Sequence, residues 1–145
     1  MANLKFLSLN ISVSSPLQSP KIVTKPWGRE IWFADQKKYA GKILEVNKGK
    51  RLSLQYHERK TETLYLLSGK MRLIYRELKS GEKHESAPID QTHEFIWEPG
   101  LTVHIPLRTI HRFEALENSV LLEASTPDLT DIVRLQDDYA RPSQD

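Results

Sequence analysis

Side chains that can bind a metal gather in one short stretch of this 145-residue chain, between Gly49 and Gly69. Gln55 and His57 are separated by one residue, and Glu62 follows five positions after His57. Alternate residues of a strand face the same side, so Gln55 and His57 are expected to point in one direction. A buried carboxylate is costly unless a cation neutralises it. If a later histidine converges with these side chains, the stretch predicts a metal site inside a β-structure.

The available ligand types limit the metal. The chain has no cysteine, so disulfides and thiolate sites are excluded, and nitrogen and oxygen atoms must hold any ion. Imidazole, carboxylate and amide oxygen together suit Zn, Mn, Fe, Co or Ni. We expect one divalent metal ion, with Zn as the first candidate. Such an ion would polarise the oxygen of a bound substrate as a Lewis acid.

Composition and charge are those of a globular domain. Hydrophobic residues make up 39% of the chain and charged residues 28%, and the formal net charge is +2. The basic residues are interspersed with acidic ones, so charge alone does not indicate nucleic-acid binding. No run approaches the roughly 20 apolar residues of a membrane-spanning helix, and the N-terminus lacks the features of a signal peptide. We therefore expect a cytoplasmic protein with no nucleic-acid and no membrane partner.

The elements that must position the ligands are predicted to be strands. Residues 1–20 end in a Ser/Pro-rich segment, which is typical of an extended N-terminal arm, and 4–11 could add an edge strand. Residues 21–145 are expected to form a single domain, large enough to bury one core. Short apolar runs between turn residues predict strands at 30–34, 40–46, 55–57, 63–67, 70–75, 95–97, 101–105, 111–115 and 120–124.

Only the C-terminus has a helical pattern. Leu129, Ile132, Val133 and Tyr139 recur at near-helical spacing, and Asp128 is placed to cap the first turn. Many short strands with so little helix favour a β-sandwich or barrel, and a double-sheet jelly roll is one such form. The sequence therefore predicts an all-β domain with a short C-terminal helix.

Basic side chains near the predicted metal ligands in the sequence are candidates for binding an anionic substrate. Arg108 and Arg112 are the first candidates, because a planar guanidinium group binds phosphate at two points. Arg59 and Lys60 lie beside the metal stretch and are weaker candidates. A solvated arginine is an equally good interpretation of either Arg108 or Arg112.

If the bound substrate reacts by proton transfer, a side chain must act as the base, and the sequence does not identify it. Glu45 and Glu123 lie in predicted strands and could face either inward or toward solvent. The remaining histidines lack partners at useful spacing. We expect His84 and His93 on surface loops and His104 as a side chain of the barrel.

The stretch from Gly49 to Gly69 resembles the first motif of the cupin family. That motif reads Gly, five residues, His-x-His, three or four residues, Glu, six residues and Gly. The present chain matches every spacing and has Gln55 in place of the first histidine. With this glutamine, the segment LSLQ-x-H resembles the cupin-type mannose-6-phosphate isomerases.

Other segments agree with this resemblance. The second cupin motif is matched at Gly100, Pro106 and His111, although Arg108 and Ala115 replace its Gly and Asn. Four further segments also resemble the isomerase family: KPWG at 25–28, HR at 111–112, DIVRL at 131–135 and DYAR at 138–141. The resemblance therefore covers residues 25 to 141.

The resemblance implies a cupin double-stranded β-helix, or jelly-roll barrel, in which Gln55, His57, Glu62 and His111 bind the metal. It implies a sugar-phosphate isomerase that interconverts mannose 6-phosphate and fructose 6-phosphate by proton transfer through an enediol. The catalytic residues would be Glu62 and Arg112, and the sugar phosphate would be bound by Arg108, Arg59 and Lys60. Cupins commonly pair through their sheet faces, so a homodimer is expected.

Two other functions stay open. His57, His111 and Glu62 also form a two-histidine, one-carboxylate set that suits a non-haem iron oxygenase. Because the second motif has lost its Gly and Asn, a non-catalytic sugar-binding or regulatory cupin is the third hypothesis.

Overall fold

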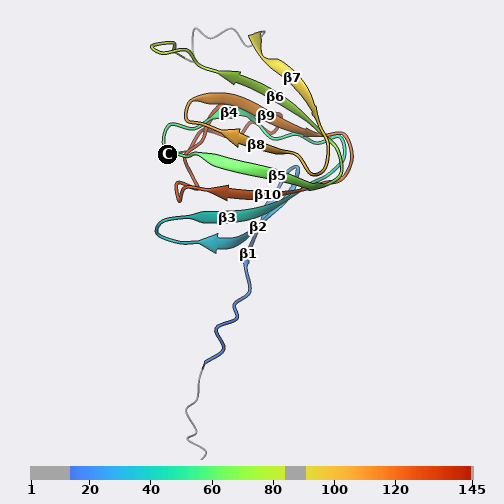
Figure 1. Cartoon of the computed structure of the whole chain (residues 1–145), viewed down its shortest axis with the longest axis vertical. Coiled ribbons are helices and arrows are strands. Elements are labelled where there is room, and N and C mark those ends of the chain that lie inside the picture. Colours follow the sequence, from blue (N-terminus) through green and yellow to red (C-terminus); the bar gives the residue numbers. More distant parts are fainter. Residues whose placement is uncertain (1–13, 84–90, 145) are drawn as a thin grey trace, which may run out of the picture.

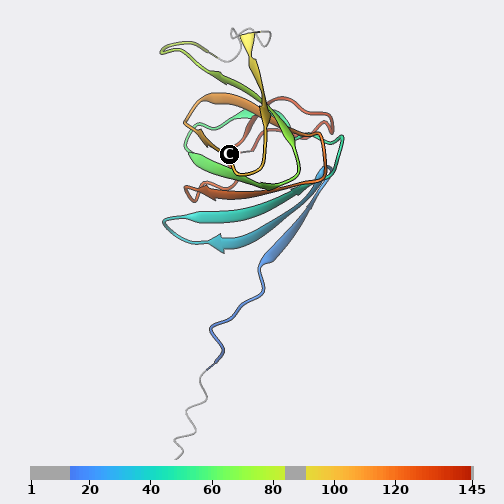
Figure 2. The same ribbon diagram turned by 45° about the vertical axis from the view of Figure 1, so that its right-hand side comes forward.

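The computed structural model describes residues 14–83 and 91–144 as two antiparallel sheets that face each other (Figure 1). The six-stranded sheet has the order β1-β2-β3-β10-β5-β8, and the five-stranded sheet has the order β11-β4-β9-β6-β7. The turned view shows the sheets curving around a common interior (Figure 2). The strands are β1 (Lys21–Lys25), β2 (Gly28–Asp35), β3 (Ala40–Val46), β4 (Leu54–Tyr56), β5 (Glu62–Ser68), β6 (Met71–Glu77), β7 (His93–Trp97), β8 (Thr102–Ile105), β9 (Thr109–Ala115), β10 (Ser119–Ser125) and β11 (Val133–Gln136).

Alternating side chains build the core between the sheets. On β5, Leu64 and Leu66 are fully buried, whereas Tyr65 and Leu67 face outward and are exposed. The period of two is what a strand with one buried face requires. The inner cluster combines large apolar side chains from both sheets: Trp27, Leu44, Val46, Leu52, Leu64, Leu66, Met71, Leu73, Trp97, Ile105, Phe113, Ala115 and Leu121.

Gly69 closes the hairpin between β5 and β6 for a steric reason. Its φ is 92°, a left-handed conformation that favours glycine. A Cβ atom at this position would lie 2.4 Å from the carbonyl oxygen of Asn118 and 2.3 Å from Oγ of Ser119. The second glycine of the metal stretch is therefore required by the close approach of the β9–β10 turn.

The all-β jelly-roll prediction is confirmed, and the expected strands are present. Residues 14–20 run away from the domain ahead of β1 (Figure 1). The expected edge strand at 4–11 lies outside the described residues, as does His84. Strands β1 and β11 are additions that the apolar pattern did not indicate.

The predicted C-terminal helix is wrong, and no α-helix occurs in residues 14–83 and 91–144. Residues 133–136 instead form β11, which pairs antiparallel with β4. Val133 and Leu135 pack against an outer apolar cluster that contains Leu54, Tyr56 and Ile110. The free edge of β4 offers unpaired backbone groups. Pairing with that edge satisfies the backbone and covers the cluster at once, which outweighs a weak helical pattern.

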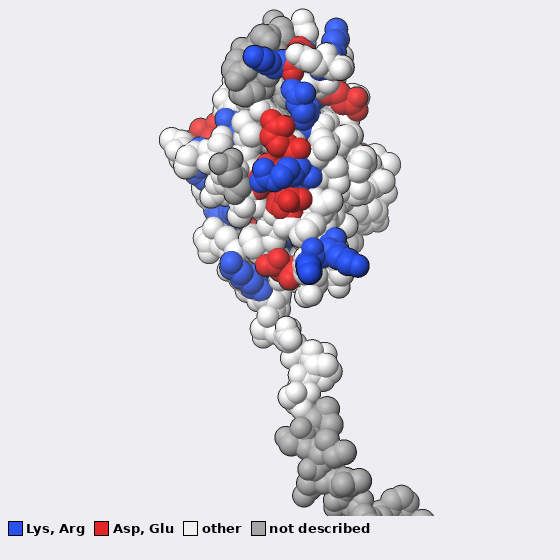
Figure 3. Space-filling view, turned by 90° about the vertical axis from the view of Figure 1, so that its left-hand side faces the viewer, with Lys and Arg blue, Asp and Glu red and all other residues white. Residues whose placement is uncertain are grey.

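The surface carries charges of both signs. On the face seen in Figure 3, Lys and Arg side chains lie beside Asp and Glu side chains along the middle of the domain, and neither sign dominates. Within the described part of the chain, no helix is long and apolar enough to cross a membrane.

Candidate metal centre

The predicted ligands converge between the two sheets. Gln55 lies on β4 opposite His111 of β9, His57 follows β4 directly, and Glu62 begins β5 in the other sheet. All four side chains are buried. His57 and His111 are brought together with Glu62 because β4 and β9 are neighbours and β5 faces them across the barrel.

Three ligand atoms face one point. Oε1 of Glu62 lies 3.4 Å from Nε2 of His57 and 3.3 Å from Nε2 of His111. Ligand atoms bound about 2.0–2.2 Å from one ion, at tetrahedral or octahedral angles, lie about 2.8–3.6 Å apart. The two observed distances fall within that range. In the described residues, this is the group of His and acidic side chains close enough to hold a metal.

The hydrogen bonds of the imidazole rings show that a cation fits here. Nδ1 of His57 lies 2.5 Å from the carbonyl oxygen of Asp131, and Nδ1 of His111 lies 2.8 Å from that of Thr109. A carbonyl only accepts, so each Nδ1 carries a proton, and each ring in its neutral form turns an Nε2 lone pair toward Glu62. Nε2 of His57 is buried without a hydrogen-bond partner. Three converging acceptors call for a positive ion between them.

Gln55 borders the group with its amide nitrogen. Oγ of Ser53 donates to Oε1 of Gln55 over 2.6 Å, and Nε2 of Gln55 lies 3.5 Å from Nε2 of His111. A half-turn of the amide would direct its oxygen toward the ligand cluster and let its nitrogen donate to the Ser53 hydroxyl, which can also accept. Gln55 is thus placed to complete the ligand set in that second orientation.

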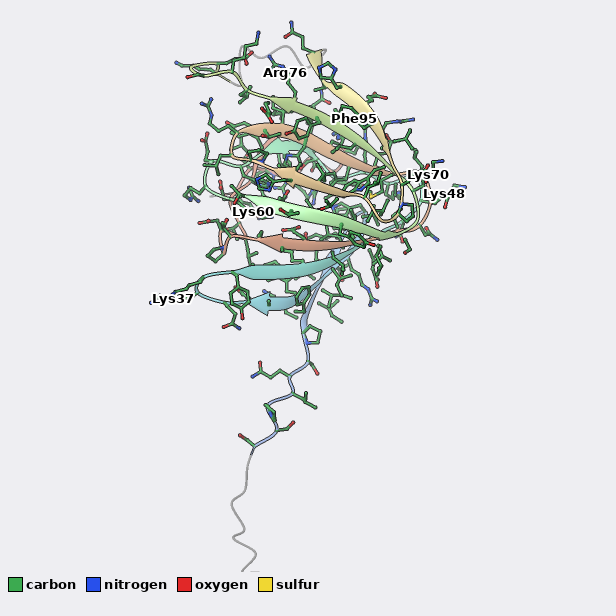
Figure 4. All side chains as sticks on the ribbon, viewed as in Figure 1. Lys37, Lys48, Lys60, Lys70, Arg76 and Phe95 are labelled. Atoms are coloured by element: carbon green, nitrogen blue, oxygen red, sulfur yellow. The ribbon has the colours of Figure 1, made fainter. Side chains whose placement is uncertain are left out.

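Lys60 links Glu62 to a second buried carboxylate. Its Nζ lies 2.6 Å from Oε2 of Glu62 and 2.7 Å from Oε1 of Glu123. Figure 4 labels Lys60 beside the start of β5. Burial opposes the charge of Lys60, but Glu123 and Glu62 outweigh it and raise the pKa of the ammonium. A permanently charged Lys60 therefore holds both carboxylates in place.

The pKa values of the two carboxyl groups are shifted in opposite directions. Burial opposes the ionised form of Glu62, but the adjacent Lys60 ammonium overcomes it and holds the pKa of the carboxyl well below its usual value. Burial raises the pKa of Glu123, and the neighbouring charge of Glu62 raises it further, against the opposing effects of Lys60 and Lys42. Glu62 thus stays ionised, as a candidate metal ligand must, whereas Glu123 is better suited to accept and release a proton.

Further charges continue this pattern across the interior. Nζ of Lys42 lies 3.2 Å from Oε2 of Glu30, and Nζ of Lys25 lies 3.8 Å from Oε1 of Glu30. Indole Nε1 of Trp32 donates to Glu30 over 2.7 Å. One cavity of about 40 Å³ is bordered by Lys25, Glu30 and Lys42 and by the candidate ligands Gln55, His57 and Glu62. The segment from Ile132 onward adds Ile132, Arg134 and Arg141 to its lining.

The structure places the predicted substrate residues unequally. Lys60 lines the cavity, but Arg59, Arg108 and Arg112 do not. Arg59 is exposed, 3.9 Å from Asp128, and Arg108 donates to the carbonyl oxygen of Glu82 over 2.6 Å. The buried Arg112 donates to the carbonyl oxygens of Leu52 and Gln136. Arg108 and Arg112 therefore hold backbone segments, whereas Arg59 lies near a carboxylate at the surface.

The alternation of side chains along the strands decides whether the remaining acidic and histidine candidates face the interior or the solvent. Glu123 faces the interior, whereas Glu45 is partly exposed and pairs with Arg29. His93 and His104 are exposed, and Nδ1 of His104 lies 3.0 Å from the hydroxyl of Thr63.

Sequence reasoning missed the cavity residues Lys25, Arg134 and Arg141 and the supporting residue Asp131. All four lie in the KPWG, DIVRL and DYAR segments. The resemblance of these three segments to the isomerase family was the signal that could have identified the four residues, but it did not indicate what each residue does.

Two facing antiparallel sheets around a His–Glu–His cluster define the chain as a cupin. A family model for the C-terminal domain of mannose-6-phosphate isomerase matches residues 14–137, and the chain belongs to that family. No curated protein sequence matches the chain.

Solved structures share the fold at low sequence identity. KdgF from Halomonas sp. is 19% identical with a TM-score of 0.56, over 72% of this chain and 84% of that one. CapF, a capsular polysaccharide assembling protein from Staphylococcus aureus, is 15% identical with a TM-score of 0.58, over 88% and 32%. Oxalate decarboxylase from Bacillus subtilis, which has Mn(II) centres, is 24% identical with a TM-score of 0.61, over 81% and 30%. The chain thus spans about a third of the latter two proteins.

Proposed function

We propose that this protein is a metal-dependent sugar-phosphate isomerase that interconverts mannose 6-phosphate and fructose 6-phosphate. The observation that carries the proposal is the convergence of Nε2 of His57, Nε2 of His111 and Oε1 of Glu62 on one point, beside a cavity that His57 and Glu62 line together with the buried Glu123. Membership of the isomerase family supports the substrate class.

The residues divide the chemistry between them. His57, Glu62 and His111, with Gln55 in its second orientation, would hold one divalent ion, with Zn as the first candidate. When bound, that ion supplies Lewis-acid stabilisation of negative charge on the sugar oxygens at C1 and C2. Glu123 removes the proton from C2 of the aldose and returns it to C1, which the raised pKa of its carboxyl favours. Lys60 fixes the direction of that carboxylate.

The size of the cavity limits how the substrate binds. A volume of about 40 Å³ is close to that of one or two water molecules. It therefore has room for the ion or for one or two oxygen-sized groups of a substrate. The charged lining residues that are partly exposed are Lys25, Arg134 and Arg141, and we take them as the mouth, where the rest of the sugar phosphate would lie.

The decisive experiment is turnover with defined metals. Protein stripped with chelator and reloaded separately with Zn, Mn, Fe, Co or Ni is mixed with mannose 6-phosphate in D2O, and fructose 6-phosphate formation and deuterium incorporation are followed by NMR. We expect turnover in the loaded protein and none in His57→Ala. Glu123→Gln should retain its metal and lose about 10²–10⁴-fold in kcat, while His104→Ala, an exposed histidine, serves as the matched control. Absence of turnover with every metal and several hexose phosphates would falsify the proposal.

The small cavity favours one alternative. Dioxygen is no larger than the one or two water molecules for which the cavity has room, and the two-histidine, one-carboxylate set is compatible with non-haem iron. Substrate-dependent oxygen uptake by the iron-loaded protein, together with no isomerisation, would favour the oxygenase. Ligand binding without either reaction would favour a non-catalytic cupin.

A further inference from the structure

Strand pairing places an arginine in line with the metal ligands. In the five-stranded sheet, Arg134 of β11 lies opposite Gln55 of β4, and Gln55 lies opposite His111 of β9. Directly opposed residues have side chains on the same face of a sheet, so all three lie on the inner face. With neighbouring strands about 4.7–4.9 Å apart, the backbones at Arg134 and His111 are separated by about 10 Å. That separation is comparable with the length of a hexose phosphate.

The guanidinium group of Arg134 has unused hydrogen-bonding capacity. One terminal nitrogen, Nη1, donates to the carbonyl oxygen of Pro142. Nε is buried and has no hydrogen-bond partner, and no ion pair joins Arg134 to a carboxylate of the described residues. Arg141 differs, because Asp137 accepts from its Nε and Nη2 at 2.9 and 2.8 Å. Arg134 is thus a partly buried cation that lacks an anion.

Like charges gather around Arg134. The cavity is lined by five cationic side chains and only three anionic ones: Lys25, Lys42, Lys60, Arg134 and Arg141 against Glu30, Glu62 and Glu123. Burial lowers the pKa of Arg134, and the charge of Arg141 lowers it further. Burial likewise lowers the pKa of Lys25, with Lys42, Arg141 and Arg134 adding to the effect against Glu30. A divalent ion would increase this positive surplus.

We propose that Arg134, assisted by Lys25 and Arg141, binds the phosphate group of the substrate at the mouth of the cavity. Nε of Arg134 and an adjacent terminal N–H donate to phosphate oxygens, the two-point geometry that a guanidinium group offers. The reacting carbons of the same molecule then reach the ligand cluster on the same inner face. The identity of the ligand as a sugar phosphate rests on the proposed function, whereas the anion subsite rests on the strand register and the unpaired guanidinium.

Equilibrium binding tests the subsite without relying on turnover. Mannose 6-phosphate, mannose and glucuronate are titrated into Mn-loaded protein by isothermal titration calorimetry. The variants are Arg134→Ala, Arg134→Lys and the control Arg72→Ala, whose guanidinium pairs with Glu114 on the outer face of the same sheet. We expect Arg134→Ala to weaken mannose 6-phosphate binding about 10- to 100-fold and Arg134→Lys to restore part of it. Mannose binding and metal content should not change, and Arg72→Ala should bind as wild type does.

Each outcome of these titrations either supports or overturns the Arg134 subsite. Equal affinity for mannose 6-phosphate in wild type and in folded Arg134→Ala overturns the subsite, as does an absence of measurable mannose 6-phosphate binding to wild type. Arg134-dependent binding of glucuronate alone overturns the phosphate assignment. If Arg134→Ala does not fold, then Arg134→Lys carries the test, because a point charge without the planar fork must bind phosphate more weakly. If phosphate binding depends on Arg134 but no isomerisation occurs, the anion subsite is supported and the proposed isomerase function is overturned. If Arg134→Ala isomerises mannose 6-phosphate as fast as wild type does, the isomerase function is supported and the subsite is overturned.

Discussion

At the scale of single residues, Asp131 supports the candidate metal centre without belonging to the predicted ligand set. Its carbonyl oxygen accepts from Nδ1 of His57, and its carboxylate accepts from the backbone N–H groups of Glu58, Arg59 and Lys60 at 3.3, 2.6 and 2.9 Å. Burial opposes the charge, but these three backbone donors lower the pKa of the carboxyl. One residue therefore fixes both the ring of His57 and the loop that leads to Glu62.

Replacing Asp131 should loosen the metal centre. In Asp131→Asn an amide group that also carries N–H donors faces the three backbone donors, so some of them are left unsatisfied. We expect a loss of about 1–3 kcal/mol in the free energy of unfolding and about 10-fold weaker metal binding, measured by urea titration and metal-competition assays. Asp128→Asn is the control, since Asp128 is 3.9 Å from the exposed Arg59. Equal metal affinity in Asp131→Asn and wild type would contradict this role.

Glu30 gives a pH-dependent prediction. Burial opposes its charge, but Lys42, Lys25 and Trp32 outweigh it, so the pKa of the carboxyl lies below its usual value of 4.5. A carboxyl whose pKa is lower in the folded state stabilises the fold above the unfolded value, and this contribution disappears as the pH falls through the folded value. Glu30→Gln also leaves Lys42, which is 5% exposed, without its partner.

We expect Glu30→Gln to lower the free energy of unfolding at pH 7 by about 3 kcal/mol, with the difference from wild type shrinking below pH 4.5. Urea unfolding at pH 7 and at pH 3.5 to 4 measures it. Glu30→Gln combined with Lys42→Met should recover much of the loss, because it removes the unpaired charge. A difference that stays constant with pH would show that the ionised carboxylate is not the source of the effect.

At the scale of elements, β11 and the segment after it form one wall of the cavity. The backbone of Gln144 exchanges two hydrogen bonds with Ile132, at 2.8 and 2.9 Å, and Pro142 accepts from Arg134. Residues 137–141 are fastened separately, since Arg51 donates to Asp138 at 2.7 and 2.9 Å. The last few residues are therefore held to β11 by few contacts.

Removing residues 142–145 should open the mouth of the cavity. The shortened chain loses the two backbone hydrogen bonds to Ile132 and frees Nη1 of Arg134 for an anion. We expect a loss of about 1–2 kcal/mol in the free energy of unfolding, together with faster release of metal to a chelator, followed by stopped flow. Unchanged release in the shortened chain would mean that the metal leaves by another route.

The sequence predicted most elements because a strand with one buried face has a period of two, which the runs at 40–46 and 63–67 show directly. The first-motif spacing similarly identified His57 and Glu62, which are close in the chain. The placement of Arg134 depends on which edge its strand joins. The apolar residues around 129–139 fit a helix or a strand about equally, so neither β11 nor its register with Gln55 could be read from them. Burial of Glu123 likewise depends on the pairing of β10 with β5, a contact between distant segments.

At the scale of the whole molecule, the outer face of the six-stranded sheet carries an apolar row. The strand registers align Tyr65 with Leu122, Leu122 with Ile43, Ile43 with Ile31 and Ile31 with Ile22. The row crosses five neighbouring strands, and its two end residues, Tyr65 and Ile22, are 40% and 57% exposed. A contiguous apolar surface of this kind is typical of an interface.

We predict that a second copy of the chain covers this row, because a two-fold axis lets one self-complementary patch bury itself. Sedimentation velocity should show a dimer for wild type, and the double variant Tyr65→Lys/Ile22→Lys should be monomeric, since four introduced charges per interface would be desolvated. Both positions are exposed in the monomer, so the variant should keep its fold. Phe95→Lys is the matched control: Phe95 is a 53% exposed aromatic side chain on β7 of the other sheet (Figure 4), and its replacement should leave the dimer intact. If wild type is a monomer at micromolar concentration, or if the double variant is still a dimer, the apolar row is not a dimer interface.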